Sequence, residues 1–278
     1  LDVDTENNYY YSEVKGRELY FVNEGLKVPK YGQAELVEAE TSFTAYQEFQ
    51  SMLTRDRIDI FMVGEFDDYQ VLQALHRFPL EGRQVDLQFS YSQPYVNVVK
   101  EKIEPRQSSQ SILQLGYQFP CQYGDKDYFA LIVFNAMFGE FAHSVLFTTL
   151  REKEGLAYSI SSQFDIFTGL LEVYAGIEKS NRNHAMRGIS RELNYIKLGR
   201  FSSSLLNQTK KIIRMNALLS EDHALTLVEQ RFNKVIFGDK SLSLENWLDE
   251  IEKVTKKDVC CVARQVKLQS LFFLEGVS

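Results

Sequence analysis

The stretch Leu150-Arg151-Glu152-Lys153-Glu154-Gly155-Leu156-Ala157-Tyr158 decides the fold, because the hydrophobic period of the chain changes across it. Before this stretch the apolar residues recur at the spacing of a helix, and after it they recur at every second position. The helical series includes Val145, Leu146 and Leu150, and the alternating series runs from Tyr158 to Ile166. The sequence therefore predicts a charged helix end, a glycine and the start of a strand.

A second alternating series follows a Thr-Gly turn, with apolar residues at every second position from Leu171 to Ile177. Two such series joined by a short glycine-containing turn are typical of an antiparallel hairpin. We expect its strands at residues 158–167 and 170–177. The helix end and the hairpin together bring Arg151 and Tyr158 to the same edge of a sheet.

Arg151 and Tyr158 are the candidate binding residues. At neutral pH a guanidinium and a phenol are hydrogen-bond donors toward a carbonyl or carboxylate oxygen, which is what holding a peptide or polarising its carbonyl requires. The alternative is structural: Arg151 pairs with Glu152 or Glu154 at the helix end, and Tyr158 fills the sheet surface. Spacing alone favours this structural interpretation.

The first part of the chain is less regular. Residues 1–43 show no sustained period, and we expect most of them to be irregular. Apolar spacing then predicts a helix over residues 46–53, a strand at 58–62 that ends at Gly64, and a second helix around 69–75. The following segment carries Pro94 and Pro105 without a period, as an inter-domain connection does.

Three regions are therefore expected: residues 1–79, a connection at 80–108, and a complete domain at 109–278. The closing unit, a helix from about 256 followed by a strand, repeats the layout of the helix and strand between 46 and 64. This internal echo indicates the tail of one structural repeat followed by one complete copy.

The complete domain is expected to be α+β, with a mostly antiparallel sheet and helices between residues 126 and 266 mainly on one face. The strand at 58–63 should belong to a different sheet. The strands expected in the main sheet are residues 112–119, 158–167, 170–177 and 270–275.

Composition excludes several classes of function. The chain has 278 residues, 44% of them hydrophobic, and a net charge of −7, which argues against a nucleic-acid partner because phosphate backbones require clustered Lys and Arg. The longest apolar run, at residues 128–134, is too short to span a bilayer, so no membrane association is expected. Three cysteines give no disulfide framework, which favours a cytoplasmic location.

Metal-binding and phosphate-binding motifs are absent from the sequence. No His-x-x-Glu-His or inverted form exists, because no two histidines lie four residues apart, and no glycine-rich phosphate loop occurs. We therefore predict no metal ligand and no cofactor in this chain. The four histidines are His76, His143, His184 and His223.

The run from Phe138-Gly139-Glu140 through Ser144-Val145-Leu146-Phe147 to Leu150–Ser159 resembles the signature of the second half of M16-family zinc peptidases. That family includes insulin-degrading enzyme and the mitochondrial processing peptidase. The resemblance implies a two-layer α+β repeat preceded by part of a second such repeat, and two halves that close around a peptide. It also implies that Arg151 and Tyr158 bind the substrate, while the zinc helix belongs to the other half.

The missing zinc motif leaves three hypotheses. The first is a non-catalytic, substrate-binding subunit, inactive alone, whose heterodimer partner is a zinc-bearing M16 subunit; a homodimer is the other assembly allowed. The second is a fragment of a full peptidase whose zinc motif precedes Leu1. The third is a structural relative with no role in proteolysis. The first is favoured, with peptide as substrate, no catalytic residue in this chain, and zinc in the partner.

Overall fold

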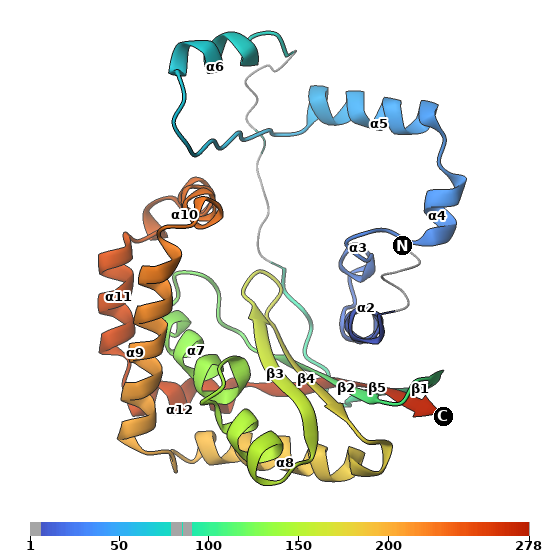
Figure 1. Cartoon of the computed structure of the whole chain (residues 1–278), viewed down its shortest axis with the longest axis vertical. Helices are drawn as coiled ribbons and strands as arrows, with labels where there is room; N and C mark the ends of the chain where they lie inside the picture. The colour runs from blue at the N-terminus through green and yellow to red at the C-terminus, as the bar shows by residue number, and fades with distance from the viewer. Residues whose placement is uncertain (1–6, 79–84, 86–90, 278) are drawn as a thin grey trace.

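The computed structural model describes residues 7–78, 85 and 91–277. A five-stranded sheet forms its centre, in the order β1-β5-β2-β4-β3 (Figure 1). Its strands are β1 (Lys100–Gln107), β2 (Ser111–Gln118), β3 (Ala157–Asp165), β4 (Leu170–Ile177) and β5 (Lys267–Val277). β1 and β5 are parallel, and the other neighbours are antiparallel.

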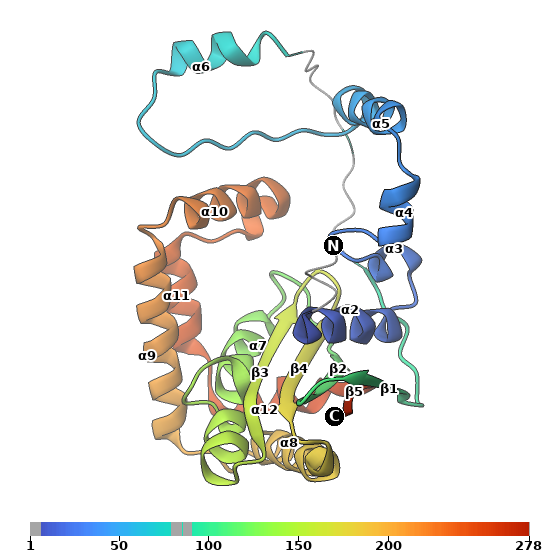
Figure 2. The same ribbon diagram turned by 45° about the vertical axis from the view of Figure 1, so that its right-hand side comes forward.

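One face of the sheet carries the main hydrophobic core. The helices α7 and α12 and the π-helical segment η1 pack on this side, together with α8, while α9 and α11 form an outer row (Figures 1 and 2). The expected α+β layer fold is thereby confirmed. The bounds are α7 (Tyr128–Asn135), η1 (Ala136–Glu140), η2 (Phe147–Lys153), α8 (Arg182–Lys197), α9 (Ser203–Ser220), α10 (Ala224–Phe237), α11 (Leu244–Lys253) and α12 (Lys256–Gln265).

Helix α2 (Asn8–Tyr20) lies on the opposite face, over β2 and β5. Its Arg17 makes two hydrogen bonds to Glu172 of β4, at 3.1 and 2.9 Å. A smaller apolar cluster, in which Leu19 packs against Phe272 and Leu274 of β5, lies under the same helix. β5 is therefore covered on both faces, which explains its uninterrupted apolar run Leu271–Leu274.

The expectation that residues 1–43 are mostly irregular is wrong for the described part of that range. It contains α2, α3 (Glu24–Lys27) and α4 (Ala34–Ala39). The Asn7 side chain accepts hydrogen bonds from the backbone of Tyr9 and Tyr10, so a normal N-cap starts α2. Hydrophobic spacing did not indicate this helix, because the three consecutive tyrosines near its start do not form one apolar stripe.

The strand expected at 58–63 does not form, so the expectation of a second sheet there is also wrong. The helices on either side do form, as α5 (Ser42–Arg55) and α6 (Asp68–Leu75). Residues 57–63 lie between them without ladder partners in the described chain, and Phe61 contacts Phe232 of α10, at 6.2 Å between ring centroids. A strand needs a neighbour for its N–H and C=O groups, and this segment has none.

The connection expected at 80–108 contains more structure than the sequence indicated. Strand β1 occupies Lys100–Gln107 and pairs along its length with β5, from Lys100 opposite Ser270 to Gln107 opposite Val277. Its side chains are polar and mostly exposed, which is why no hydrophobic period marked it. Residues 79–84 and 86–90 of the expected connection lie outside the described residues.

Candidate functional site

The junction between η2 and β3 has the predicted sequence of helix, glycine and strand. Two backbone hydrogen bonds close the helix: Glu154 N–H donates to the carbonyl of Thr149 at 2.9 Å, and Leu156 N–H donates to the carbonyl of Leu150 at 2.8 Å. Gly155 sits between them with φ +62°, a left-handed conformation that costs glycine little. The glycine thus lets the chain reverse from helix into strand.

The helix at this junction is π-helical rather than α-helical over Phe147–Lys153. Short π-helical segments are rare and occur frequently at functional sites. Leu150 is fully buried, and Gly188 of α8 packs against it, since an added Cβ would come within 3.2 Å of the leucine side chain. The buried leucine fixes the helix, so that the next residue, Arg151, points outward.

Arg151 is exposed, and its guanidinium lies over the ring of Phe147 at 4.6 Å from the centroid. Glu154, one of its two expected structural partners, instead pairs with Arg191 of α8 at 2.6 Å. Among the residues described, no ion pair joins Arg151 to Glu152 either. The guanidinium keeps its hydrogen-bonding edge available while its flat face rests on an aromatic ring.

Tyr158 lies at an irregularity in the hairpin. Ala157 is opposite Ile177, and Ser159 is opposite Gly176, so the register shifts at Tyr158. Such bulges redirect a side chain and occur preferentially near active sites. The Tyr158 side chain is 56% exposed.

The Tyr158 hydroxyl donates a hydrogen bond to Glu178 Oε1 at 2.9 Å. This hydrogen bond raises the pKa of Tyr158 above its ordinary value, so the phenol stays protonated. Glu178 directly follows β4, and the sequence analysis missed it. The predicted hairpin could have indicated Glu178, because in an antiparallel pair the start of one strand lies beside the end of the other.

The structure therefore places both predicted residues on the surface of one junction, from adjoining segments η2 and β3. The two side chains have separate partners: Arg151 rests on Phe147, and Tyr158 donates to Glu178. Together they place a cation and a phenol on the surface beside the edge strand β3. Their role in binding stays a prediction.

A polar chain behind the junction connects η1 to β3. Asn135 donates from Nδ2 to Glu140 Oε2 at 2.9 Å and accepts from Ser162 Oγ at 2.7 Å. Gly139 is required here, because an added Cβ would come within 2.8 Å of the Ser162 backbone nitrogen. Loss of solvation raises the pKa of the Glu140 carboxyl. This chain holds the helix turn close to the strand that carries Tyr158.

The segment between η1 and η2 is tied to α9 by His143. Its Nε2 lies 2.8 Å from Thr209 Oγ1, and Thr209 itself donates to the Leu205 carbonyl at 2.9 Å. The Thr209 hydroxyl thus connects His143 to the backbone of α9. Burial lowers the pKa of His143.

The described residues contain no group of three or more His, Cys, Asp and Glu side chains that could hold a metal ion. A catalytic zinc site needs about three protein ligands. The described residues therefore do not fit a zinc site. No helix within the described ranges is both long enough and apolar enough to cross a membrane.

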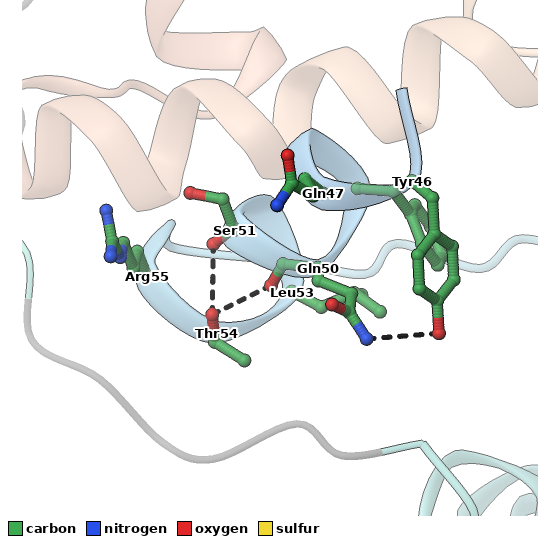
Figure 3. A pocket seen from close by; sticks show the side chains of 8 residues that line it. Tyr46, Gln47, Gln50, Ser51, Leu53, Thr54 and Arg55 are labelled. Atoms are coloured by element: carbon green, nitrogen blue, oxygen red, sulfur yellow. Dashed lines mark hydrogen bonds between the residues drawn. The ribbon is translucent and has the colours of Figure 1, made fainter. Parts of the chain in front are cut away.

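A hollow along α5 is an alternative candidate, shown in Figure 3. All its lining residues belong to this one helix, and the side chains shown bond mainly within it: Gln50 Nε2 to Tyr46 at 3.0 Å, and Thr54 Oγ1 to the Gln50 carbonyl at 2.7 Å. One helix face cannot enclose a ligand. The junction of η2 and β3 remains the stronger candidate.

The chain is similar to several known proteins. It is 34% identical over 246 residues to the "Probable inactive metalloprotease YmfF" of Bacillus subtilis, covering 88% of this chain and 58% of that relative. The chain thus spans little more than half the length of this curated relative. A crystal structure of a conserved protein from Enterococcus faecalis superposes with a TM-score of 0.94 at 35% identity, over 100% of this chain and 66% of that one.

A peptidase M16 inactive domain from Pseudomonas fluorescens shares the fold, with a TM-score of 0.74 at 16% identity, over 100% of this chain and 68% of that one. The family model described as "Peptidase M16 inactive domain" matches residues 46–213. This range includes the whole η2–β3 junction and covers more than half of the chain. The chain therefore belongs to the M16 peptidase family, as an inactive-domain member.

Proposed function

We propose that this chain is the non-catalytic, substrate-binding subunit or half of an M16-type zinc-dependent peptidase. It holds the peptide through Arg151 and Tyr158, while a zinc-bearing M16 partner supplies the metal site. The observation that carries the proposal is the presentation of both side chains at one junction, each exposed beside a backbone irregularity. The match to the inactive-domain model supports the non-catalytic part.

The two residues would act as donors to substrate oxygens. The guanidinium of Arg151 offers several N–H groups in one plane, which suits a carboxylate or a backbone carbonyl. The phenol of Tyr158 offers one O–H to a carbonyl, and such a donor gains strength as negative charge develops on that oxygen. Both are binding groups, and bond cleavage itself belongs to the partner.

The proposed assembly is a heterodimer with the zinc-bearing subunit, located in the cytoplasm; a homodimer is the competing arrangement. The isolated chain would then hydrolyse no peptide. Elemental analysis of the purified chain should find zinc far below one ion per chain. One tightly bound zinc per chain would contradict the division of labour proposed here.

The direct test combines the chain with a zinc-bearing M16 subunit and measures hydrolysis of a fluorogenic peptide library. Arg151→Ala and Tyr158→Phe should each lower the rate by about 10- to 1000-fold, the range for lost donors to a developing oxyanion. Their melting temperatures should change little, because both side chains are exposed. Arg187→Ala on α8 and Tyr46→Phe on α5 serve as matched controls, because each alters an exposed side chain on another helix. Full activity in both test variants, with the complex intact, would refute the binding role.

A second candidate is a structural subunit without a role in proteolysis. One observation favours it: each proposed donor already has an intramolecular contact, Arg151 with Phe147 and Tyr158 with Glu178. The same assay separates the two functions. A structural subunit would support the complex equally well with or without the two side chains.

A further inference from the structure

The single phenolic proton of Tyr158 is already in use. The hydroxyl donates to Glu178 Oε1 at 2.9 Å, and a phenol has only one proton to give. In this arrangement the Tyr158 oxygen can accept a hydrogen bond but cannot donate one to a substrate carbonyl. Tyr158 can donate to a substrate only after its hydroxyl turns away from the Glu178 carboxylate, and a ligand that pairs with this carboxylate favours that turn.

The Glu178 carboxylate is open to a ligand. Both Glu178 and Tyr158 are exposed. The neighbouring cation Lys179 is paired with Glu275 at 3.2 Å, and Arg182 is paired with Glu101. Across the described chain, no Lys, Arg or His side chain forms an ion pair with Glu178. Among the described residues, the hydrogen bond from Tyr158 is the one side-chain contact of this carboxylate, and it leaves the negative charge uncompensated.

We propose that Glu178 makes this site select peptides that present a cationic group, a Lys or Arg side chain or a free amine, beside the carbonyl that Tyr158 receives. This inference rests on the proposed peptide-binding function. The incoming cation pairs with the carboxylate, and the phenolic proton turns from Glu178 to the substrate carbonyl. Glu178 is then a specificity-determining and positioning residue.

A neutral or acidic peptide should bind more weakly than a cationic one. It must break the hydrogen bond between Tyr158 and Glu178 without offering the carboxylate a new partner, and the lost charge-assisted hydrogen bond weakens binding. An acidic peptide is repelled in addition. Arg151, across the same junction, supplies the positive charge for the peptide's own oxygens.

The experiment measures binding of two fluorescently labelled peptides to the full chain by anisotropy. The peptides are ten residues long and identical, except that one carries Lys where the other carries Gln, with the position varied along the peptide. At the best position we expect the Lys peptide to bind about five-fold tighter, as an exposed ion pair allows. Added salt should reduce the ratio, because it screens that pair.

Two variants separate charge from hydrogen bonding. Glu178→Gln keeps an oxygen that accepts from Tyr158 but removes the charge, so the Lys-to-Gln ratio should fall to about one. Glu178→Ala removes both and should in addition tighten binding of the Gln peptide, because Tyr158 is released. Glu250→Gln removes a carboxylate from an exposed ion pair on α11 and should leave the ratio unchanged.

The outcomes distinguish the role of Glu178 from the proposed peptide-binding function. An unchanged ratio in Glu178→Gln, or no preference in the unaltered chain, overturns the role of Glu178 while Tyr158→Phe can still weaken both peptides. Unchanged binding in Arg151→Ala and Tyr158→Phe, or no binding of any peptide, overturns the proposed function as well. Thermal melts of each variant confirm that the fold persists.

Discussion

The α12–β5 unit and the segment from α5 to Gly64 share one local layout but differ in what surrounds them. Each begins with a helix opened by a capping box, Thr255 with Asp258 in α12 and Thr41 with Thr44 in α5. In each, a short link and an extended apolar segment follow. α12 and β5 lie in the core, whereas α5 contains no buried residue.

The difference shows what local sequence decides and what it leaves to tertiary contacts. The caps and apolar spacing are sufficient for both helices to form. The extended segments diverge, because β5 has β1 on one side and β2 on the other, while residues 57–63 have no strand beside them in the described chain. Phe49, Met52 and Ile60 therefore remain 51%, 41% and 49% exposed.

The largest expected effect is in β5. Phe273 is 1% exposed and belongs to the main core, so Phe273→Ala should lower the free energy of unfolding by about 3–5 kcal/mol through lost burial and a cavity. Urea denaturation followed by circular dichroism measures it. A loss below about 1 kcal/mol would mean that the core does not depend on this strand.

Much of this fold was predictable because its signals are local. The hairpin of β3 and β4, the strand β2 and the helices from α7 to α12 follow from apolar spacing, and all of them except α10, which has no buried residue, contribute to the main core. β1 escaped detection because it is an edge strand with polar side chains. α2 escaped because an ion pair to Glu172 and a few apolar contacts hold it, instead of one apolar stripe.

The candidate site was predictable only in part. Arg151 and Tyr158 came from a motif resemblance, and Gly155 from its place between two periods. Glu178 lies twenty positions after Tyr158 in the chain and reaches it only through the hairpin register. The π-helix and the bulge that present the two side chains leave no mark in hydrophobic spacing.

A second prediction concerns the docking of α2, the N-terminal helix that, unlike α5, packs against the sheet. Glu172→Gln keeps the size of the side chain but removes the charge that Arg17 pairs with in a largely buried setting. We expect a loss of about 1–2 kcal/mol in unfolding free energy, reduced from the cost of a fully buried pair because Arg17 is partly exposed. Faster proteolysis within residues 8–20 should accompany it.

Glu18→Gln, which removes a partner of Lys15 on the same helix, is the matched control for that variant. It should change stability by less than about 0.5 kcal/mol, as exposed pairs do. Equal losses in the two variants would mean that the contact with β4 does not dock α2.

A third, smaller effect is a pH dependence in the well-packed region. Burial depresses the pKa of His143 in the folded chain below its value in the unfolded chain, near 6.5. The unfolded state then binds more protons as the pH falls, so stability is complete above about pH 6.5 and declines as the pH falls toward the folded pKa. His143→Gln should flatten this decline in melting temperature between pH 7 and 5. An equal flattening in His184→Gln, which alters an exposed histidine of α8, would assign the effect elsewhere.

The smallest expected effect is in α5, and a large effect there would contradict the difference between α5 and the α12–β5 unit. Phe49 has the same side chain as Phe273 but is 51% exposed, so Phe49→Ala should change the unfolding free energy by no more than about 0.5 kcal/mol. The reason is that truncation removes little buried area and opens no cavity, and the helix keeps its capping box. Denaturation of both Phe→Ala variants under the same conditions gives the contrast directly. A loss of 2 kcal/mol or more in Phe49→Ala would show that α5 packs on an apolar surface in solution, and that the two copies of the layout are equivalent after all.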